Sequence, residues 1–155
     1  MSRLDCCNSF LAGLSLAGLD RLQHIENKVL CIVKRLPWRA HVSAARVELH
    51  WLPIFERIVY KLVSLVYSTL ATNEPEYLSD LLTCYVPARC VRSMHDKTRL
   101  VVPFARTKLA EGSFSYAGPA AWNDLPQALR ERDSLNSFKT ALKEYLFVRS
   151  LLVID

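Results

Sequence analysis

The stretch that most constrains the fold is residues 53–72. Pro53 suits the first turn of a helix, because its fixed φ is already helical and an N–H is not needed there. Only a narrow polar stripe interrupts the apolar residues, namely Arg57, Lys61, Ser64 and Ser68. Apolar residues at helical spacing cover the rest of the circumference: Ile54, Ile58, Val59, Leu62, Leu65, Val66 and Leu70. We therefore predict a helix at 53–72 that lies at the centre of the domain and is covered on more than one side.

A second long helix is predicted over 16–36. Its apolar residues recur on one side of a helical wheel: Leu19, Leu22, Ile25, Val29, Ile32, Val33 and Leu36. The opposite side carries Arg21, His24, Lys28 and Arg35 within an arc of roughly 60°. We expect the apolar side to pack and the basic side to face solvent. Pro37 ends the helix at Leu36, because proline disfavours helical geometry at the residue before it.

The rest of the chain divides into short helices and an irregular segment. Short helices are expected at 43–50, 76–82 and 119–124, and the helix-breaking residues Gly118 and Pro119 mark the boundary before the last of these. Residues 83–110 hold two prolines and two β-rich patches, at 84–86 and 100–102, which is typical of extended loop with one short hairpin at most. A final amphipathic helix is predicted at 134–147, with Asp133 or Ser134 as its N-cap.

These elements predict the fold class. We expect a mostly α protein of about four to six helices, a small helical bundle with an irregular, partly extended C-terminal segment and a final amphipathic helix. The parts are a helical domain at 2–82, a basic extended linker at 83–118 with possible short strands, a C-terminal helical part at 119–147 and a tail at 148–155.

The cysteines and the apolar runs bear on the compartment. Five cysteines, an odd number at irregular spacing, argue against a secreted disulfide framework. The first 19 residues lack an apolar run behind a basic region, and no stretch approaches the ~18 apolar residues of a membrane span. We expect a reduced, intracellular chain, cytoplasmic or nuclear, with no membrane partner.

Motifs for catalysis and metal binding are weak. Cys84, Cys90 and His95 form the one cluster to test against zinc, but it has no Cys-x-x-Cys pair and no evident fourth ligand. Neither the nucleophile elbow nor the common glycine-rich phosphate loops occur. The acidic residues are scattered, whereas two-metal chemistry needs clustered carboxylates. The prediction is therefore no catalytic residue, no metal and no cofactor.

The charge distribution is more informative than the net charge of +5. Residues 28–46 hold five basic residues and no acid, and residues 86–110 hold six basic residues against Asp96. Trp38, His41, Tyr85 and His95 are interleaved with these cations and could stack on bases, while Lys and Arg release counterions from phosphates. An ordinary solvated helix face followed by a soluble loop explains the same pattern about equally well.

Short strings over most of the chain carry a resemblance to a known family. In order they are Ser2-Arg3-Leu4-Asp5-Cys6-Cys7-Asn8-Ser9, Leu19-Asp20-Arg21-Leu22-Gln23, Leu49-His50-Trp51-Leu52-Pro53, Pro75-Glu76-Tyr77-Leu78-Ser79-Asp80-Leu81-Leu82, Val101-Val102-Pro103, Phe114-Ser115-Tyr116-Ala117-Gly118-Pro119-Ala120-Ala121-Trp122-Asn123-Asp124-Leu125-Pro126 and Ser134-Leu135-Asn136-Ser137-Phe138-Lys139. Together they resemble the C-terminal region of non-LTR (LINE-type, jockey-like) retrotransposon reverse transcriptases, downstream of the polymerase palm. The resemblance covers about residues 2–147.

The resemblance implies a thumb-like helical part that grips an RNA or RNA–DNA template-primer duplex through its backbone. The candidate nucleic-acid contacts are Arg21, Lys28, Arg35, Arg39, Arg89, Arg92, Arg99, Arg106 and Lys108. Residues 50–53 and the Trp122-Asn123-Asp124-Leu125-Pro126 run look structural. The palm and its Asp-Asp motif are missing, so the resemblance implies a non-catalytic fragment of an RNA-directed DNA polymerase, with the palm as its absent partner. The alternative is a structural or protein-interaction remnant of a transposable element, which self-associates through exposed apolar surface.

Overall fold

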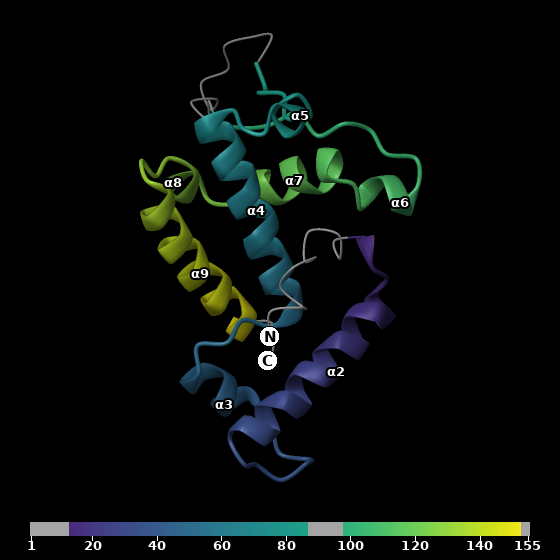
Figure 1. The fold of residues 1–155 in the computed structure, drawn as a ribbon, viewed down its shortest axis with the longest axis vertical. Coiled ribbons are helices and arrows are strands. Elements are labelled where there is room, and N and C mark those ends of the chain that lie inside the picture. The colour runs from purple at the N-terminus through teal and green to yellow at the C-terminus, as the bar shows by residue number, and fades with distance from the viewer. Residues whose placement is uncertain (1–12, 87–97, 153–155) are drawn as a thin grey trace.

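The described residues, 13–86 and 98–152 in a computed structural model, form eight helices joined by loops (Figure 1). In chain order they are α2 (Leu16–Val33), α3 (Ser43–Glu48), α4 (Ile54–Thr72), α5 (Glu76–Ser79), α6 (Lys108–Glu111), α7 (Phe114–Asn123), α8 (Gln127–Arg130) and α9 (Leu135–Leu152). Within these ranges the one β-type pairing is an antiparallel bridge between Cys84 and Leu100. The predicted fold class, a mostly α bundle with a final helix, is confirmed.

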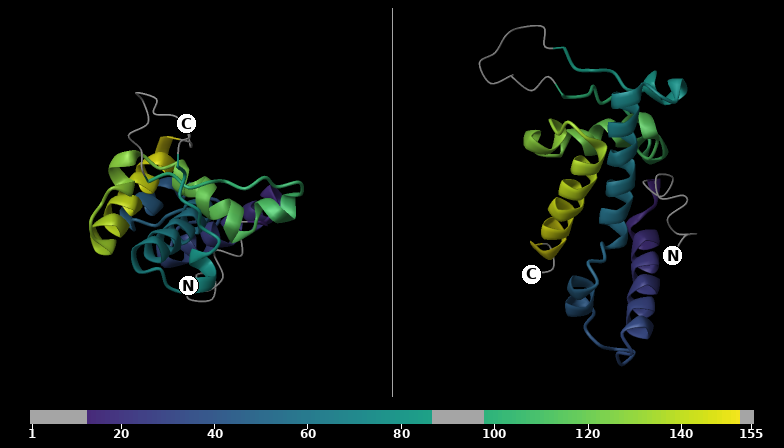
Figure 2. Two further views of the ribbon diagram at one scale, coloured as in Figure 1. Left: turned by 90° about the horizontal axis from the view of Figure 1, so that it is seen from above. Right: turned by 60° about the vertical axis from the view of Figure 1, so that its left-hand side comes forward.

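Helix α4 is the central element, as its apolar circumference predicts. It contacts α2, α7 and α9, and Figures 1 and 2 show it running through the middle of the molecule. It begins at Ile54, directly after Pro53, and ends where Asn73 takes a left-handed conformation with φ 55°. Asn tolerates that region better than most residues. Two members of the predicted polar stripe, Arg57 and Ser64, are nevertheless buried.

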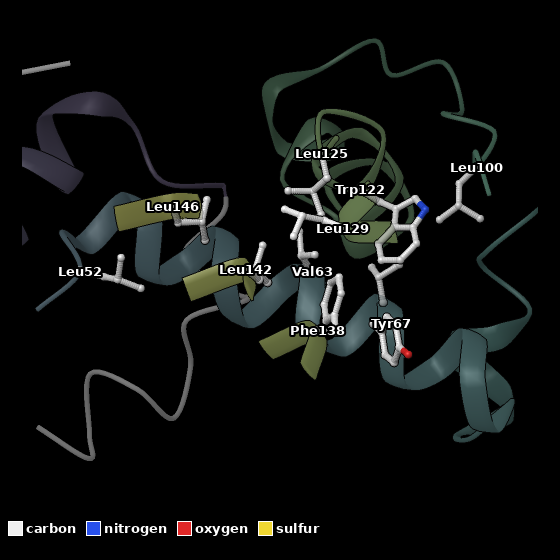
Figure 3. Packing of buried hydrophobic residues seen from close by; sticks show 11 residues of the cluster. Leu52, Val63, Tyr67, Leu100, Trp122, Leu125, Leu129, Phe138, Leu142 and Leu146 are labelled. Carbon is white, nitrogen blue, oxygen red and sulfur yellow. The ribbon is translucent and has the colours of Figure 1, made fainter. Parts of the chain in front are cut away.

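The hydrophobic core lies where α4, α7 and α9 meet (Figure 3). The Phe138 ring of α9 stacks on the Tyr67 ring of α4, with centroids 4.3 Å apart, and its centroid lies 5.9 Å from that of Trp122 in α7. Aromatic pairs at such separations add to the stabilisation that comes from burying their area. Residues from the predicted helical domain and from the predicted C-terminal part thus share one core.

Helix α7 corrects the predicted boundary at Gly118 and Pro119. The helix begins at Phe114 rather than at 119, so both residues lie inside it. Proline removes one helical hydrogen bond, but both residues are buried against the core. A Cβ at Gly118 would lie 3.1 Å from Cγ2 of Val66, so glycine at this position lets α7 approach α4 closely. Tertiary packing outweighs the local breaker signal here.

The Trp122-Asn123 pair holds the extended segment onto α7. Trp122 Nε1 donates a hydrogen bond to the Thr98 carbonyl at 2.7 Å. The Asn123 amide accepts from the Leu100 N–H at 3.0 Å and donates to the Leu100 carbonyl at 2.8 Å, as a neighbouring strand would. Leu100 is thereby fixed in the core. The structural interpretation of this pair is confirmed.

Other boundaries differ from the prediction. Residues 83–118, expected to be extended, hold α6 and the first half of α7, and α8 was not predicted. Both α6 and α8 are single turns, too short for a periodic pattern to reveal. The final helix continues to Leu152 instead of ending at 147. Its start agrees with the prediction, because the Ser134 hydroxyl accepts a hydrogen bond from the Ser137 N–H at 3.2 Å.

Candidate nucleic-acid interface

The side of α2 that packs includes a buried acid, and part of the predicted apolar side faces solvent. Glu26 is only 2% exposed and is buried together with Leu30 and Cys31. Ile25 and Ile32, expected to pack, are each more than half exposed. The apolar periodicity therefore predicts the buried side only in part, because Glu26 has a partner on α4 while Ile25, Ile32 and Val33 stay exposed.

Hydrogen bonds and an ion pair join α2 to α3 and α4. Arg57 Nη2 of α4 lies 2.8 Å from Glu26 Oε1 and also donates to the Leu52 carbonyl at 3.2 Å. Gln23 Oε1 accepts at 2.9 Å from the N–H of Ile54, which is among the first N–H groups of α4 and has no partner within that helix. This polar network fixes the angle at which α2 leaves the body of the molecule.

Arg46 of the first basic block belongs to the same network. Its Nη2 donates to Asn27 Oδ1 at 2.6 Å, and the residue is buried. Burial lowers the pKa of Arg46 from its ordinary value, an effect that the nearby Glu26 carboxylate opposes and Arg57 reinforces. Lys34 is also engaged, in an ion pair with Glu48. These two cations hold structure, so only part of the first basic block is available for a ligand.

The remaining cations of that block lie on the surface. Arg21, Lys28, Arg35 and Arg39 are all exposed. Helix α2 ends at Val33, three residues earlier than predicted. The Leu36 N–H then bonds to the Cys31 carbonyl and the Arg35 N–H to the Ile32 carbonyl, the two bonds of a Schellman motif. Arg35 occupies the left-handed position of this motif, with φ 51°, where glycine is usual.

An exposed tryptophan lies among these cations. Trp38 is 64% exposed in the loop between α2 and α3, at one end of the long axis in Figure 1. The Lys28 amine lies 4.8 Å from the centroid of its ring, within cation–π range. We name the surface formed by Lys28, Arg35, Trp38 and Arg39 the basic tip. It combines cations for phosphates with an aromatic ring for a base.

The second basic block does not join the basic tip within the described residues. Arg99, Arg106 and Lys108 are exposed on the segment that leads to α6. Figures 1 and 2 both place this segment toward the opposite end of the long axis from the loop that carries Trp38. Arg89 and Arg92 lie outside the described residues. The cations predicted from the sequence therefore form two separate surfaces.

Sequence reasoning missed a third cationic surface, formed by Lys139 and Lys143 of α9. They line a cavity together with Tyr60 of α4 and His50, which follows α3. Segment sums of charge hide the two lysines, because acids elsewhere in residues 111–155 outweigh them. Their spacing of four residues, which puts both on one side of a helix, is the signal that could have found them.

The described part of the chain holds neither a cluster of metal-ligating side chains nor a helix that could cross a membrane. Of the cluster tested against zinc, Cys90 and His95 lie outside the described residues, and Cys84 is exposed. Residues 13–86 and 98–152 hold no group of three or more His, Cys, Asp or Glu side chains placed to bind a metal ion. In the same ranges, every helix is too short or too polar to span a lipid bilayer.

Comparison with family models, with curated proteins and with solved structures finds no match to this chain.

Proposed function

We propose that this chain is a sequence-nonspecific nucleic-acid-binding module. In this proposal it corresponds to the part of a retrotransposon RNA-directed DNA polymerase that follows the palm, and it grips the backbone of an RNA–DNA template-primer without catalysis of its own. The observation that carries the proposal is the basic tip, where Arg35 and Arg39 are exposed beside Trp38. The resemblance over residues 2–147 supports the choice of polymerase.

Backbone contacts explain both the affinity and the lack of sequence preference. Phosphate contacts fix the position of a nucleic acid but carry no sequence information. Arg21, Lys28, Arg35 and Arg39 offer up to four such contacts along α2 and the loop after it. Trp38 adds a stacking surface that accepts any base. Arg99, Arg106 and Lys108 provide a second, separate contact region for a longer duplex.

The affinity for an RNA–DNA hybrid is expected to fall about 100-fold between 50 and 200 mM salt, the loss for about four phosphate contacts. Fluorescence anisotropy of a labelled hybrid measures this slope. The double variant Arg35→Gln/Arg39→Gln should flatten the logarithmic slope by about 1.5, because two contacts are lost. Lys61→Gln, which removes an exposed cation from α4, is the matched control and should change the slope little. No binding at 50 mM salt would refute the proposal.

The alternative function, a protein-interaction remnant, is favoured by one specific observation. Ile25, Ile32 and Val33, which we name the apolar stripe, are each more than half exposed on one side of α2. Contiguous exposed apolar surface marks an interaction site or a tendency to aggregate. The occupant proposed under this alternative is a second copy of the chain.

Self-association through the apolar stripe is expected to disappear in the variant Ile25→Glu/Ile32→Glu, because two buried charges oppose an apolar contact. Size-exclusion chromatography with light scattering measures the mass as a function of concentration. The control is Phe104→Glu/Leu109→Glu, which places the same charges at two other exposed apolar positions. If the wild-type chain stays monomeric at about 0.1 mM, the alternative fails.

A further inference from the structure

A cavity of about 370 Å³ lies between α4 and α9, away from the basic tip. Its lining comes from His50 after α3, Tyr60 of α4 and one side of α9, including Lys139, Lys143 and Phe147. The lining is mostly apolar. Small-molecule sites have this character, an apolar surface with a few convergent polar groups, and volumes from about 300 Å³ upward.

The charged groups at this cavity favour an anion. Lys139 and Lys143 stand four residues apart, so their side chains lie on the same side of α9, where like charges repel. Neither amine makes a hydrogen bond or ion pair within the described residues. Glu144 is the single acid in the lining, so two ammonium groups face one carboxylate. A bound anion would relieve the repulsion between the two amines.

The polar atoms beside the lysines differ in what they can donate. Burial raises the pKa of Tyr60 above its ordinary value, although the side chain of Ser64 opposes the shift. Its phenol is therefore protonated at neutral pH and can donate to an anion. The Thr140 hydroxyl already donates to the Asn136 carbonyl at 3.0 Å, so it offers only its lone pairs. The donors for an anion are thus the two amines and the phenol.

His50 is held over this cavity in an unfavourable backbone conformation. Its φ is 48°, and it occupies the left-handed position of a Schellman motif at the end of α3, with Trp51 N–H bonded to the Arg46 carbonyl at 3.0 Å. The imidazole stacks on the Phe147 ring, with centroids 5.6 Å apart and planes 7° from parallel. The turn and the stack together give the cavity a flat aromatic wall.

We propose that this cavity binds a mononucleotide, with the Lys139 and Lys143 amines on its phosphate and the His50–Phe147 wall against its base. Inorganic phosphate alone would leave the apolar lining unused, and a nucleoside alone would leave both amines without a counterion. The site is independent of the proposed function, because none of its lining residues belongs to the basic tip.

Isothermal titration of the whole chain with adenosine monophosphate, adenosine and inorganic phosphate tests the proposal. Saturable binding of adenosine monophosphate is expected, with each of the other two probes at least about tenfold weaker. Lys139→Gln and Lys143→Gln should each lower the affinity for adenosine monophosphate about tenfold, because a charged hydrogen bond is lost. Lys61→Gln, an exposed lysine of α4 outside the lining, should bind as the wild type does.

The opposing outcomes are equally definite. Absence of saturation up to about 10 mM adenosine monophosphate, or equal binding of adenosine, would overturn the assignment. The two lysine variants could instead lower the affinity for an RNA–DNA hybrid while adenosine monophosphate does not bind. The lysines would then contact the phosphates of a polymer, and the mononucleotide site would be refuted. Loss of hybrid binding in Arg35→Gln/Arg39→Gln, with adenosine monophosphate still bound, would support two separate sites.

Discussion

Glu26→Ala is expected to lower the free energy of unfolding by about 3–5 kcal/mol, because it removes one partner of a buried ion pair. Glu26 and Arg57 form a buried ion pair with a 2.8 Å contact between Oε1 and Nη2. Without the carboxylate, the Arg57 guanidinium stays buried and loses its ion pair with Glu26. Arg46, whose pKa burial already lowers, would lose the same favourable field. Urea denaturation followed by circular dichroism measures the loss.

The matched control for this prediction is Glu48→Ala. It breaks the Lys34–Glu48 pair, which joins the C-terminal end of α2 to α3 and whose carboxylate is largely exposed. Exposed pairs contribute about 0–1 kcal/mol, so this variant should melt close to the wild type. The double variant Glu26→Leu/Arg57→Met should recover much of the stability, because an apolar pair replaces a buried ion pair at little cost. Equal losses in Glu26→Ala and Glu48→Ala would contradict the account.

The same residues explain why the sequence misleads about α2. A helical wheel ranks sides by hydropathy, and on that ranking the side with Ile25 and Ile32 should pack. Burial of Glu26 depends instead on its ion pair with Arg57, which is 31 residues away on α4. No periodic pattern within α2 contains that information. For α4 the wheel succeeds, because its apolar side chains leave no alternative to burial on several sides.

The features of the candidate sites likewise differ in whether the sequence predicts them. Exposure of Arg21 and Lys28 follows from their position on a polar helix side, and both are exposed. Whether two basic blocks converge is a question about the path of the chain, and local charge counts cannot answer it. The cavity at Lys139 depends on His50, about 90 residues earlier, being carried by a turn to α9. Such long-range placement is set by the core and not by any local motif.

That core is best tested at Phe138. Phe138→Ala is expected to cost about 3–5 kcal/mol, because the ring is completely buried and its removal leaves a cavity between three helices. Stacking on Tyr67 at 4.3 Å is lost as well. Phe104→Ala is the control, since that ring is 91% exposed and its removal should change stability by less than about 0.5 kcal/mol. Urea melts followed by circular dichroism measure both.

The position of Phe138 also makes the test informative about the interface. Its ring contacts α4 and α7, whereas the basic tip is held by the polar network of Glu26 and Gln23. Under conditions where Phe138→Ala is still folded, its affinity for an RNA–DNA hybrid should therefore equal that of the wild type. The Glu26→Ala variant, even when it is folded, should bind the hybrid more weakly, because the substitution releases α2, the helix that carries the basic tip. A larger binding defect in Phe138→Ala than in Glu26→Ala would show that the core, and not the polar network, sets the position of α2.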